Sequence, residues 1–201
     1  YIMVNIKLLY KEEKIMRKNF GAKPFTYPQP VFILASYDKD GIPNAMNAAW
    51  GGITADSELT MCIGADHKTT ANILERGAFT VSMADAEHMA QCDYVGIVSG
   101  NDVKDKFERA GFHAVKSEFV DAPLIEELAI AAECRLKSYD PESCRMVGEI
   151  VNVSADEKVL DKDGKVDVYK ARPITFDPFN NTYVVLGDIA GKAFHDGGSI
   201  K

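Results

Sequence analysis

The feature that most constrains this fold is a succession of short apolar runs separated by tight-turn signals. The run at residues 31–37 is followed by Asp38-Lys39-Asp40-Gly41 and then by a second run at residues 43–49. Asp-Gly accommodates the positive φ angles of a tight turn, so the two runs predict a β-hairpin. Further β-rich runs lie at residues 59–63, 78–83, 128–139, 145–155, 166–169, 173–176 and 182–186. So many short strands predict a mainly β fold that closes as a barrel.

A few short helices are expected between the strands. Residues 70–76 are compatible with a helix that Gly77 ends. From residue 85 to residue 111 the apolar residues recur irregularly at helical spacing. This pattern predicts two short helices, with Asn101 or Asp102 as the N-cap of the second. Residues 54–58 are interpreted as a polar connection between strands.

The length and composition predict one globular domain. A chain of 201 residues with 46% hydrophobic and 26% charged residues can bury a sizeable core. We assign residues 16–201 to that domain. Residues 1–15 precede Met16, a plausible natural start, and are interpreted as an N-terminal extension or as residues left from cloning; packing on a partner subunit is the alternative.

Charge and hydropathy exclude several classes of partner. A net charge of -7 with a pI near 5.1 disfavours nonspecific binding to nucleic acid or to anionic membranes, which requires clustered Lys and Arg. No apolar run is long enough to cross a membrane, and no signal peptide is recognisable. A cytoplasmic protein without membrane or nucleic-acid contacts is the expectation.

The cysteines do not indicate a metal site. Cys62, Cys92, Cys134 and Cys144 are scattered and form no C-x-x-C pair, and no metal ligand is assigned. Cys62 and Cys134 lie within apolar strand patterns and are predicted to be core residues. Cys144 stands beside Arg145, so it is the cysteine for which a more reactive thiol is considered, with a structural role as the alternative.

Two segments suggest a ligand site. In Asn47-Ala48-Ala49-Trp50-Gly51-Gly52 the small residues would let a flat ligand approach the backbone, and Trp50 offers an aromatic surface. His67-Lys68-Thr69-Thr70 stands where a helix should begin, and free N–H groups, a lysine and hydroxyls suit a phosphate. Together they predict a phosphorylated aromatic cofactor. A bend between strands and an ordinary polar helix start remain the alternatives.

From about residue 20 to residue 194 the sequence resembles the flavin reductase-like, flavoredoxin-type proteins. The order and spacing of the matching pieces carry the resemblance, since each piece alone is unspecific. The pieces are residues 30–36, 40–50, 67–73, 77–82, Asp93-Tyr94-Val95-Gly96, Ser99-Gly100, Lys106-Phe107, residues 122–125, Glu133-Cys134 and residues 148–150. The resemblance implies an FMN-binding split β-barrel, mainly β with short helices in a single domain, and a homodimer.

The resemblance also implies the site. In that family the segment matching residues 44–50 lies against the isoalloxazine ring of FMN, and the segment matching residues 67–72 holds the ribityl phosphate. A lysine matching Lys106 approaches the cofactor, with a solvated helix face as the alternative. Phe194 would stack on the ring or pack on the barrel. The candidate cofactor residues are Asn47, Ala48, Ala49, Trp50, His67, Lys68, Thr69, Thr70, Asn72, Ser82, Lys106 and Phe194.

One departure affects the expected electron donor. Many flavin reductases of this family carry Gly-Asp-His shortly before the strand that matches residues 148–150, and its histidine is linked to the nicotinamide side. Residues 140–145 contain no histidine here, so the resemblance does not imply NAD(P)H as the direct electron donor. The expectation is an FMN-dependent oxidoreductase that passes electrons from a small-molecule or protein donor to an acceptor. An FMN electron-transfer protein without its own NAD(P)H oxidation is the alternative, and a dimeric barrel without flavin is a third. No catalytic side chain is assigned, because the redox chemistry belongs to the cofactor.

Overall fold

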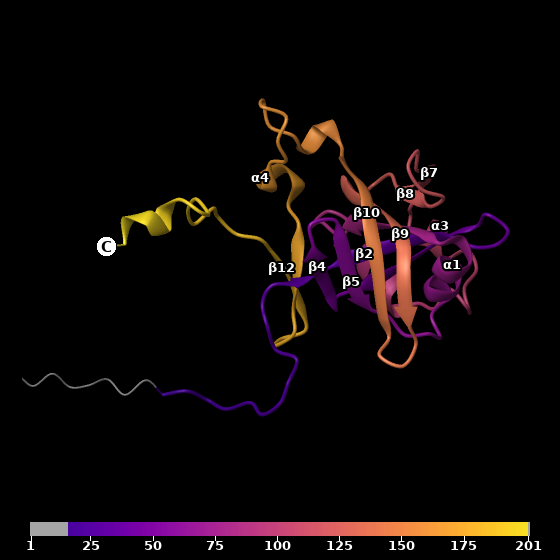
Figure 1. The fold of residues 1–201 in the computed structure, drawn as a ribbon, viewed down its shortest axis with the longest axis horizontal. Coiled ribbons are helices and arrows are strands. Elements are labelled where there is room, and N and C mark those ends of the chain that lie inside the picture. The colour runs from indigo at the N-terminus through magenta and orange to yellow at the C-terminus, as the bar shows by residue number, and fades with distance from the viewer. Residues whose placement is uncertain (1–15, 201) are drawn as a thin grey trace, which may run out of the picture.

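A curled seven-stranded antiparallel sheet forms the centre of the molecule (Figure 1). The structure is a computed structural model and describes residues 16–200; the predicted extension at residues 1–15 lies outside the described residues. The strand order is β3-β2-β6-β9-β10-β5-β4. The strands are β2 (Phe32–Tyr37), β3 (Pro43–Ala48), β4 (Gly51–Ala55), β5 (Glu58–Cys62), β6 (Ala78–Met83), β9 (Ile130–Asp140) and β10 (Arg145–Ala155).

Both faces of this sheet are covered by apolar side chains. One face carries a core that includes Leu34, Phe79 and Met146, and Ile73 of α1 (Lys68–Arg76) packs into it. The other face carries Ile33 and Ala45, which pack with residues of α2 (Met89–Ile97) and α3 (Lys106–Arg109). Strands buried on both faces explain why these runs are apolar rather than strictly alternating.

Two smaller sheets complete the domain. One has the order β1-β11-β12, with β1 (Gln29–Pro30), β11 (Ile174–Asp177) and β12 (Thr182–Val185). The other pairs β7 (Ala114–Lys116) with β8 (Pro123–Ile125). The remaining helical turns are η1 (Glu157–Val159), α4 (Val168–Ala171) and η2 (Asp196–Ser199). The residues after β12 run away from the barrel to the C-terminal end (Figure 1).

The predicted hairpin and first helix are confirmed. Gly41 has a φ of 81°, and the Asp38 N–H donates to the Ile42 carbonyl at 2.9 Å, which closes the turn between β2 and β3. Helix α1 ends at Gly77, whose φ of 67° is left-handed. The strand expected at residues 78–83 and that expected at residues 145–155 have the bounds predicted. Within the described residues, no helix is long and apolar enough to span a membrane.

Several expectations were wrong. Residues 51–55 form strand β4, so the polar connection shrinks to the turn before β5. The strand expected at residues 166–169 is a single bridge at Val166 followed by helix α4, whose N-cap Asp167 accepts from the Tyr169 N–H. Asp105, rather than Asn101 or Asp102, is the N-cap of α3. Strands β7 and β8 were not predicted, because each has only three residues, too few to show the alternation of apolar and polar side chains that marks a strand.

Candidate functional site

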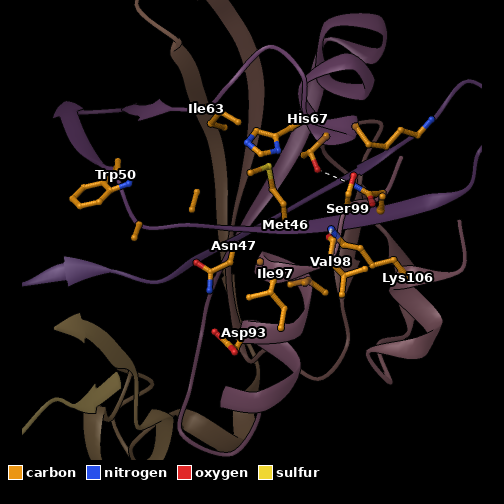
Figure 2. Close-up of a pocket in the computed structure, with 18 of the residues that line it drawn as sticks. Met46, Asn47, Trp50, Ile63, His67, Asp93, Ile97, Val98, Ser99 and Lys106 are labelled. Atoms are coloured by element: carbon orange, nitrogen blue, oxygen red, sulfur yellow. Dashed lines mark hydrogen bonds between the residues drawn. The ribbon is translucent and has the colours of Figure 1, made fainter. Parts of the chain in front are cut away.

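A cavity of about 590 Å³ lies where β3, the start of α1 and the segment from α2 to α3 meet (Figure 2). This volume falls within the range of sites for small molecules. Its lining combines main-chain and polar groups with an apolar surface. The lining residues are Asn44, Met46, Asn47, Ala48, Ala49, Trp50, Cys62, Ile63, His67, Lys68, Thr69, Asp93, Val95, Gly96, Ile97, Val98, Ser99, Gly100, Lys106, Phe176 and Tyr183.

The end of β3 supplies the aromatic part of the site. Ala48 and Ala49 leave the backbone accessible, and Trp50 stands at the edge of the cavity with 44% of its surface exposed. Gly51 has a different role from the one the sequence suggested. A Cβ there would lie 2.7 Å from the Met61 side chain and 2.8 Å from the Thr60 carbonyl oxygen, so β5 demands the glycine. The alternative interpretation of this Gly-Gly pair as a bend between strands is also wrong, because the bend lies at Trp50 and both glycines belong to β4.

The start of α1 offers groups that suit an anion. His67 is the N-cap residue and makes no side-chain cap bond, and the first turn holds no acidic residue. The N–H groups of this turn and the positive end of the helix dipole therefore remain available to an anion. Lys68 and Thr69 line the cavity beside them. The Thr69 hydroxyl is fixed by Asn44, whose Nδ2 donates to it at 2.7 Å.

Lys68 is held by a neighbouring carboxylate. Its Nζ lies 3.4 Å from Oδ2 of Asp38, which is itself mostly buried. Burial opposes the ionisation of Asp38, but backbone N–H donors and the Lys68 ammonium outweigh it and lower the pKa of this carboxyl. Lys104 lies in an adjoining recess of about 260 Å³ that also includes Lys68.

Two glycines allow the α2 to α3 segment to lie directly on β3. A Cβ on Gly96 would stand 2.9 Å from the Asn47 Cβ. A Cβ on Gly100 would collide with Oδ1 of Asn44 and stand 3.3 Å from the Lys68 Cβ. Both glycines are therefore required by the close approach that shapes the cavity.

Replacing Gly100 with alanine should displace Asn44 and break its bond to Thr69. Because a net hydrogen bond is worth roughly 1 kcal/mol, we expect the affinity for a phosphorylated ligand to fall about 5- to 10-fold. Titration of the ligand by fluorescence measures the change. Gly52→Ala, where an added Cβ meets no atom within 4 Å, is the matched control. Equal affinities of Gly100→Ala and wild type would contradict the proposed close fit.

Lys106 is buried at the floor of the site. It is 3% exposed, its Nζ donates to the Val98 carbonyl at 2.8 Å, and burial lowers its pKa to about 8. The alternative of a solvated helix face is thereby excluded for this residue. Within the described residues no carboxylate is bonded to its ammonium.

The lowered pKa of Lys106 predicts a pH-dependent stability. Below pH 8 Lys106 is charged in both the folded and the unfolded protein, and the folded protein bears the free-energy cost of burying that charge. Between about pH 8 and 10.5 the folded protein releases the proton first, so its free energy of unfolding should rise with pH, by at most about 3 kcal/mol. Lys106→Met should lack this rise, whereas Lys116→Met should keep it. Urea unfolding at pH 7.5 and 10 measures the difference; identical pH profiles of Lys106→Met and wild type would refute the burial argument.

A tyrosine and an aspartate stand together elsewhere in the lining. The Tyr183 hydroxyl donates to Oδ1 of Asp93 at 2.7 Å, and Asn47 Nδ2 donates to the Cys92 carbonyl at 3.2 Å. Burial and the Asp93 carboxylate both raise the pKa of Tyr183. The phenol is therefore neutral and its proton is directed to Asp93, so its oxygen can accept a hydrogen bond from a ligand.

The structure brings most of the predicted site residues together. Those that line the cavity are Asn47, Ala48, Ala49, Trp50, His67, Lys68, Thr69 and Lys106. Four others lie elsewhere. Thr70 is buried and its hydroxyl donates to the Gly64 carbonyl at 2.8 Å. Asn72 and Ser82 are buried outside the lining, and within the described chain Nδ2 of Asn72 and Oγ of Ser82 have no partner. Phe194 is fully exposed on the C-terminal segment.

Some lining residues were not predicted. Asp93, Gly96, Ser99 and Gly100 fall in pieces that carried the family resemblance, so a signal for them was present in the sequence. Phe176 and Tyr183 come from strands more than 100 residues after β3 and the start of α1, and no local pattern marks them as site residues. Cys62, expected in the core, is exposed at the end of β5 and lines the cavity.

The arrangement suits a flavin nucleotide. The anion-binding turn of α1 fits a phosphate, and the small residues beside Trp50 fit a flat ring. The cavity also offers a hydrogen-bond acceptor at Tyr183. Among residues 16–200 there is no group of three or more His, Cys, Asp or Glu side chains that could hold a metal ion.

Comparison with known proteins agrees with this geometry. The flavoredoxin of Desulfovibrio vulgaris (Miyazaki F) superposes with a TM-score of 0.86 and 37% identity, covering 90% of this chain and 100% of the other. The flavoredoxin of Methanosarcina acetivorans superposes with a TM-score of 0.82 and 29% identity, covering 92% of this chain and 100% of the other. An FMN-binding domain of a flavin reductases-like enzyme from Shewanella baltica OS155 shows the same fold. Its TM-score is 0.70 at 19% identity, covering 82% of this chain and 89% of the other.

The family model described as "Flavin reductase like domain" matches residues 25–173, which include β2 to β10 and most of the cavity lining. The split β-barrel and the flavin-related redox character that the resemblance implied are confirmed. The chain belongs to the flavin reductase-like domain family.

Proposed function

We propose that this protein is an FMN-dependent oxidoreductase that passes electrons from a reduced donor through bound FMN to an acceptor. The observation that carries the proposal is the cavity in which the uncapped start of α1, with Lys68 and Thr69, shares one space with Trp50 and the small residues of β3. Two flavoredoxins with TM-scores above 0.8 support it.

The residues present divide the work of holding FMN. Lys68, Thr69 and the first N–H groups of α1 would hold the phosphate. The backbone of residues 47–49 and the Trp50 ring would border the isoalloxazine. When bound, FMN supplies the electron-accepting and electron-donating chemistry, and the protein contributes position, hydrogen bonds and exclusion of water.

A second candidate is an FMN electron-transfer protein that does not oxidise NAD(P)H itself. The observation in its favour is the turn between β9 and β10, which packs against the cavity-lining end of β5 and carries no histidine. The Ile63 N–H donates there to the Cys144 carbonyl at 2.8 Å. His67, at the start of α1, is the one histidine among the described lining residues.

We further propose a homodimer and a cytoplasmic setting. The C-terminal segment leaves the barrel, and on it Ile189 is 67% exposed and Phe194 is fully exposed. Apolar side chains exposed in this way suit burial against a second copy of the chain. All four cysteines are free thiols, as a reducing compartment requires. If the subunits share the flavin site, dilution to monomers should release FMN. Light scattering combined with flavin fluorescence tests this, and a monomer that retains FMN would refute the shared site.

The visible spectrum decides the cofactor first. Purified protein mixed with FMN and freed of excess by gel filtration should retain the bands of oxidised flavin; a colourless protein would overturn the FMN proposal. Stopped mixing of the loaded protein with NADH and with NADPH then separates the two candidates. Rapid bleaching excludes the carrier-only alternative, and no bleaching with either donor excludes a reductase that uses them.

A further inference from the structure

The four cysteines fall into two pairs that differ in environment. Cys92 and Cys134 are 0% exposed, and burial raises the pKa of each thiol to about 12. Cys62 is exposed and Cys144 is half-buried. Thiol chemistry in the folded protein is therefore restricted to Cys62 and Cys144, because the thiolate is the reactive form.

These two accessible cysteines meet at one end of the β5–β10 ladder. Cys62 Sγ lies 3.9 Å from the carbonyl oxygen of Ser143. Cys62 is opposite Arg145, and the next hydrogen bond along the ladder joins the Ile63 N–H to the Cys144 carbonyl at 2.8 Å. This bond ties the peptide group that follows Cys62 directly to Cys144, so the two backbones are close enough for a disulfide to be considered.

The local backbone frees Cys144 from the regular strand. Its φ of 57° is left-handed, so its side chain does not follow the alternation of β10. Tyr139 lies beside this end of β5, and its hydroxyl donates to the Ile63 carbonyl at 2.9 Å. Burial raises the pKa of Tyr139, and the Cys144 and Cys62 thiols raise it further.

One member of the pair, Cys62, also borders the cavity described above. The Cys62 N–H donates to the Trp50 carbonyl at 2.8 Å. A covalent change at Cys62 should therefore alter the surroundings of Trp50.

We propose that Cys62 and Cys144 form a redox-active dithiol at the edge of the cavity, which a hydroperoxide oxidises to an intramolecular disulfide. The exposed Cys62 thiolate attacks the peroxide, the O–O bond breaks, and Cys62 becomes a sulfenic acid as hydroxide or alkoxide leaves. The Cys144 thiolate then attacks the Cys62 sulfur, the S–S bond forms, and hydroxide leaves and takes up a proton to give water. The dithiol loses two electrons, which reduce the peroxide. This inference is independent of the proposed function.

Peptide mapping tests the pair directly. The reduced full chain is exposed to hydrogen peroxide, free thiols are blocked, and the protein is digested without reductant. We expect a peptide that links Cys62 to Cys144, lighter by two hydrogen atoms than the two separate peptides. Cys92 and Cys134 serve as internal controls and should stay reduced until the protein is unfolded. A mixture of isotopically light and heavy protein should give no link between chains.

Single-cysteine variants distinguish the pair from two independent thiols. In Cys144→Ser, Cys62 should accumulate as a sulfenic acid that dimedone traps; Cys62→Ser should form no link. The fluorescence of Trp50, the only tryptophan, should change reversibly on oxidation in wild type but not in Cys62→Ser. Separate oxidation of the two cysteines in wild type without a linked peptide, or links only between chains, would overturn the proposal.

Discussion

Lys68→Ala is expected to weaken FMN binding about 10- to 100-fold while leaving riboflavin binding nearly unchanged. A hydrogen bond to a charged group contributes about 1.5–3 kcal/mol, and each 1.4 kcal/mol is tenfold in affinity. Lys68 lies at the uncapped start of α1 beside Thr69, where a phosphate would gain both the ammonium and the helix N–H groups. Riboflavin lacks the phosphate, so it reports only on the ring site. Fluorescence titration with both flavins measures the effect.

Controls make the Lys68 result specific. Lys116→Ala removes a lysine from the exposed strand β7 and should leave both affinities unchanged. Asp38→Asn keeps Lys68 but removes the carboxylate 3.4 Å from its Nζ, and it should strengthen FMN binding or leave it unchanged. An equal loss of FMN and riboflavin in Lys68→Ala would show general damage to the site. An unchanged FMN affinity would show that the phosphate is bound elsewhere.

Gly148→Ala should lower the free energy of unfolding by about 3 kcal/mol, near the upper end of the range for overpacked cores. An added Cβ would stand 2.5 Å from Cζ and 3.1 Å from Cε1 of Phe79, and 3.5 Å from the Cys134 Cβ. Phe79 is 0% exposed at the centre of the core, so its ring has no free space to enter. The ladder between β9 and β10 also shifts register between Val147 and Gly148, close to where Gly148 meets the ring.

Thermal and urea unfolding measure this effect. For a domain of this size, each kcal/mol lowers Tm by about 2–4 °C. Gly52→Ala places a methyl group in open space in the same sheet and should change stability by less than about 0.5 kcal/mol. Combining Gly148→Ala with Phe79→Leu should give a smaller loss than the sum of the two single changes, because the smaller side chain removes the clash. A wild-type Tm for Gly148→Ala would mean that the ring moves aside without cost.

Local chemistry made part of the fold predictable. Asp40-Gly41 specified its hairpin, and Gly77 specified the end of α1, because each needs only the conformational freedom of one residue. β4 was missed because the two glycines at its start carry no apolar period. Strand pairing with β5, where Thr60 and Met61 crowd Gly51, decides that segment.

The site divides in the same way. The polar turn at the start of α1 was predictable because Lys68 and Thr69 are neighbours in sequence and the helix start follows from them. Asp93 and Tyr183, 90 residues apart, meet only through the packing of α2 against β12. The burial that lowers the pKa of Lys106 likewise comes from the tertiary fold, since its sequence neighbours are mostly charged. The same holds for the exposure of Cys62 and its position beside Cys144.

By itself the sequence determined the mainly β domain, the family and the two segments that border the cavity. Hydrophobic period, turn residues and helix caps act over a few positions, and the order of the family pieces is written along the chain. The tertiary structure alone decided which glycines are closely packed, which lysine is buried and which cysteines are neighbours. Those properties depend on contacts between strands distant in sequence, and no local pattern encodes the side chain that arrives from the other strand.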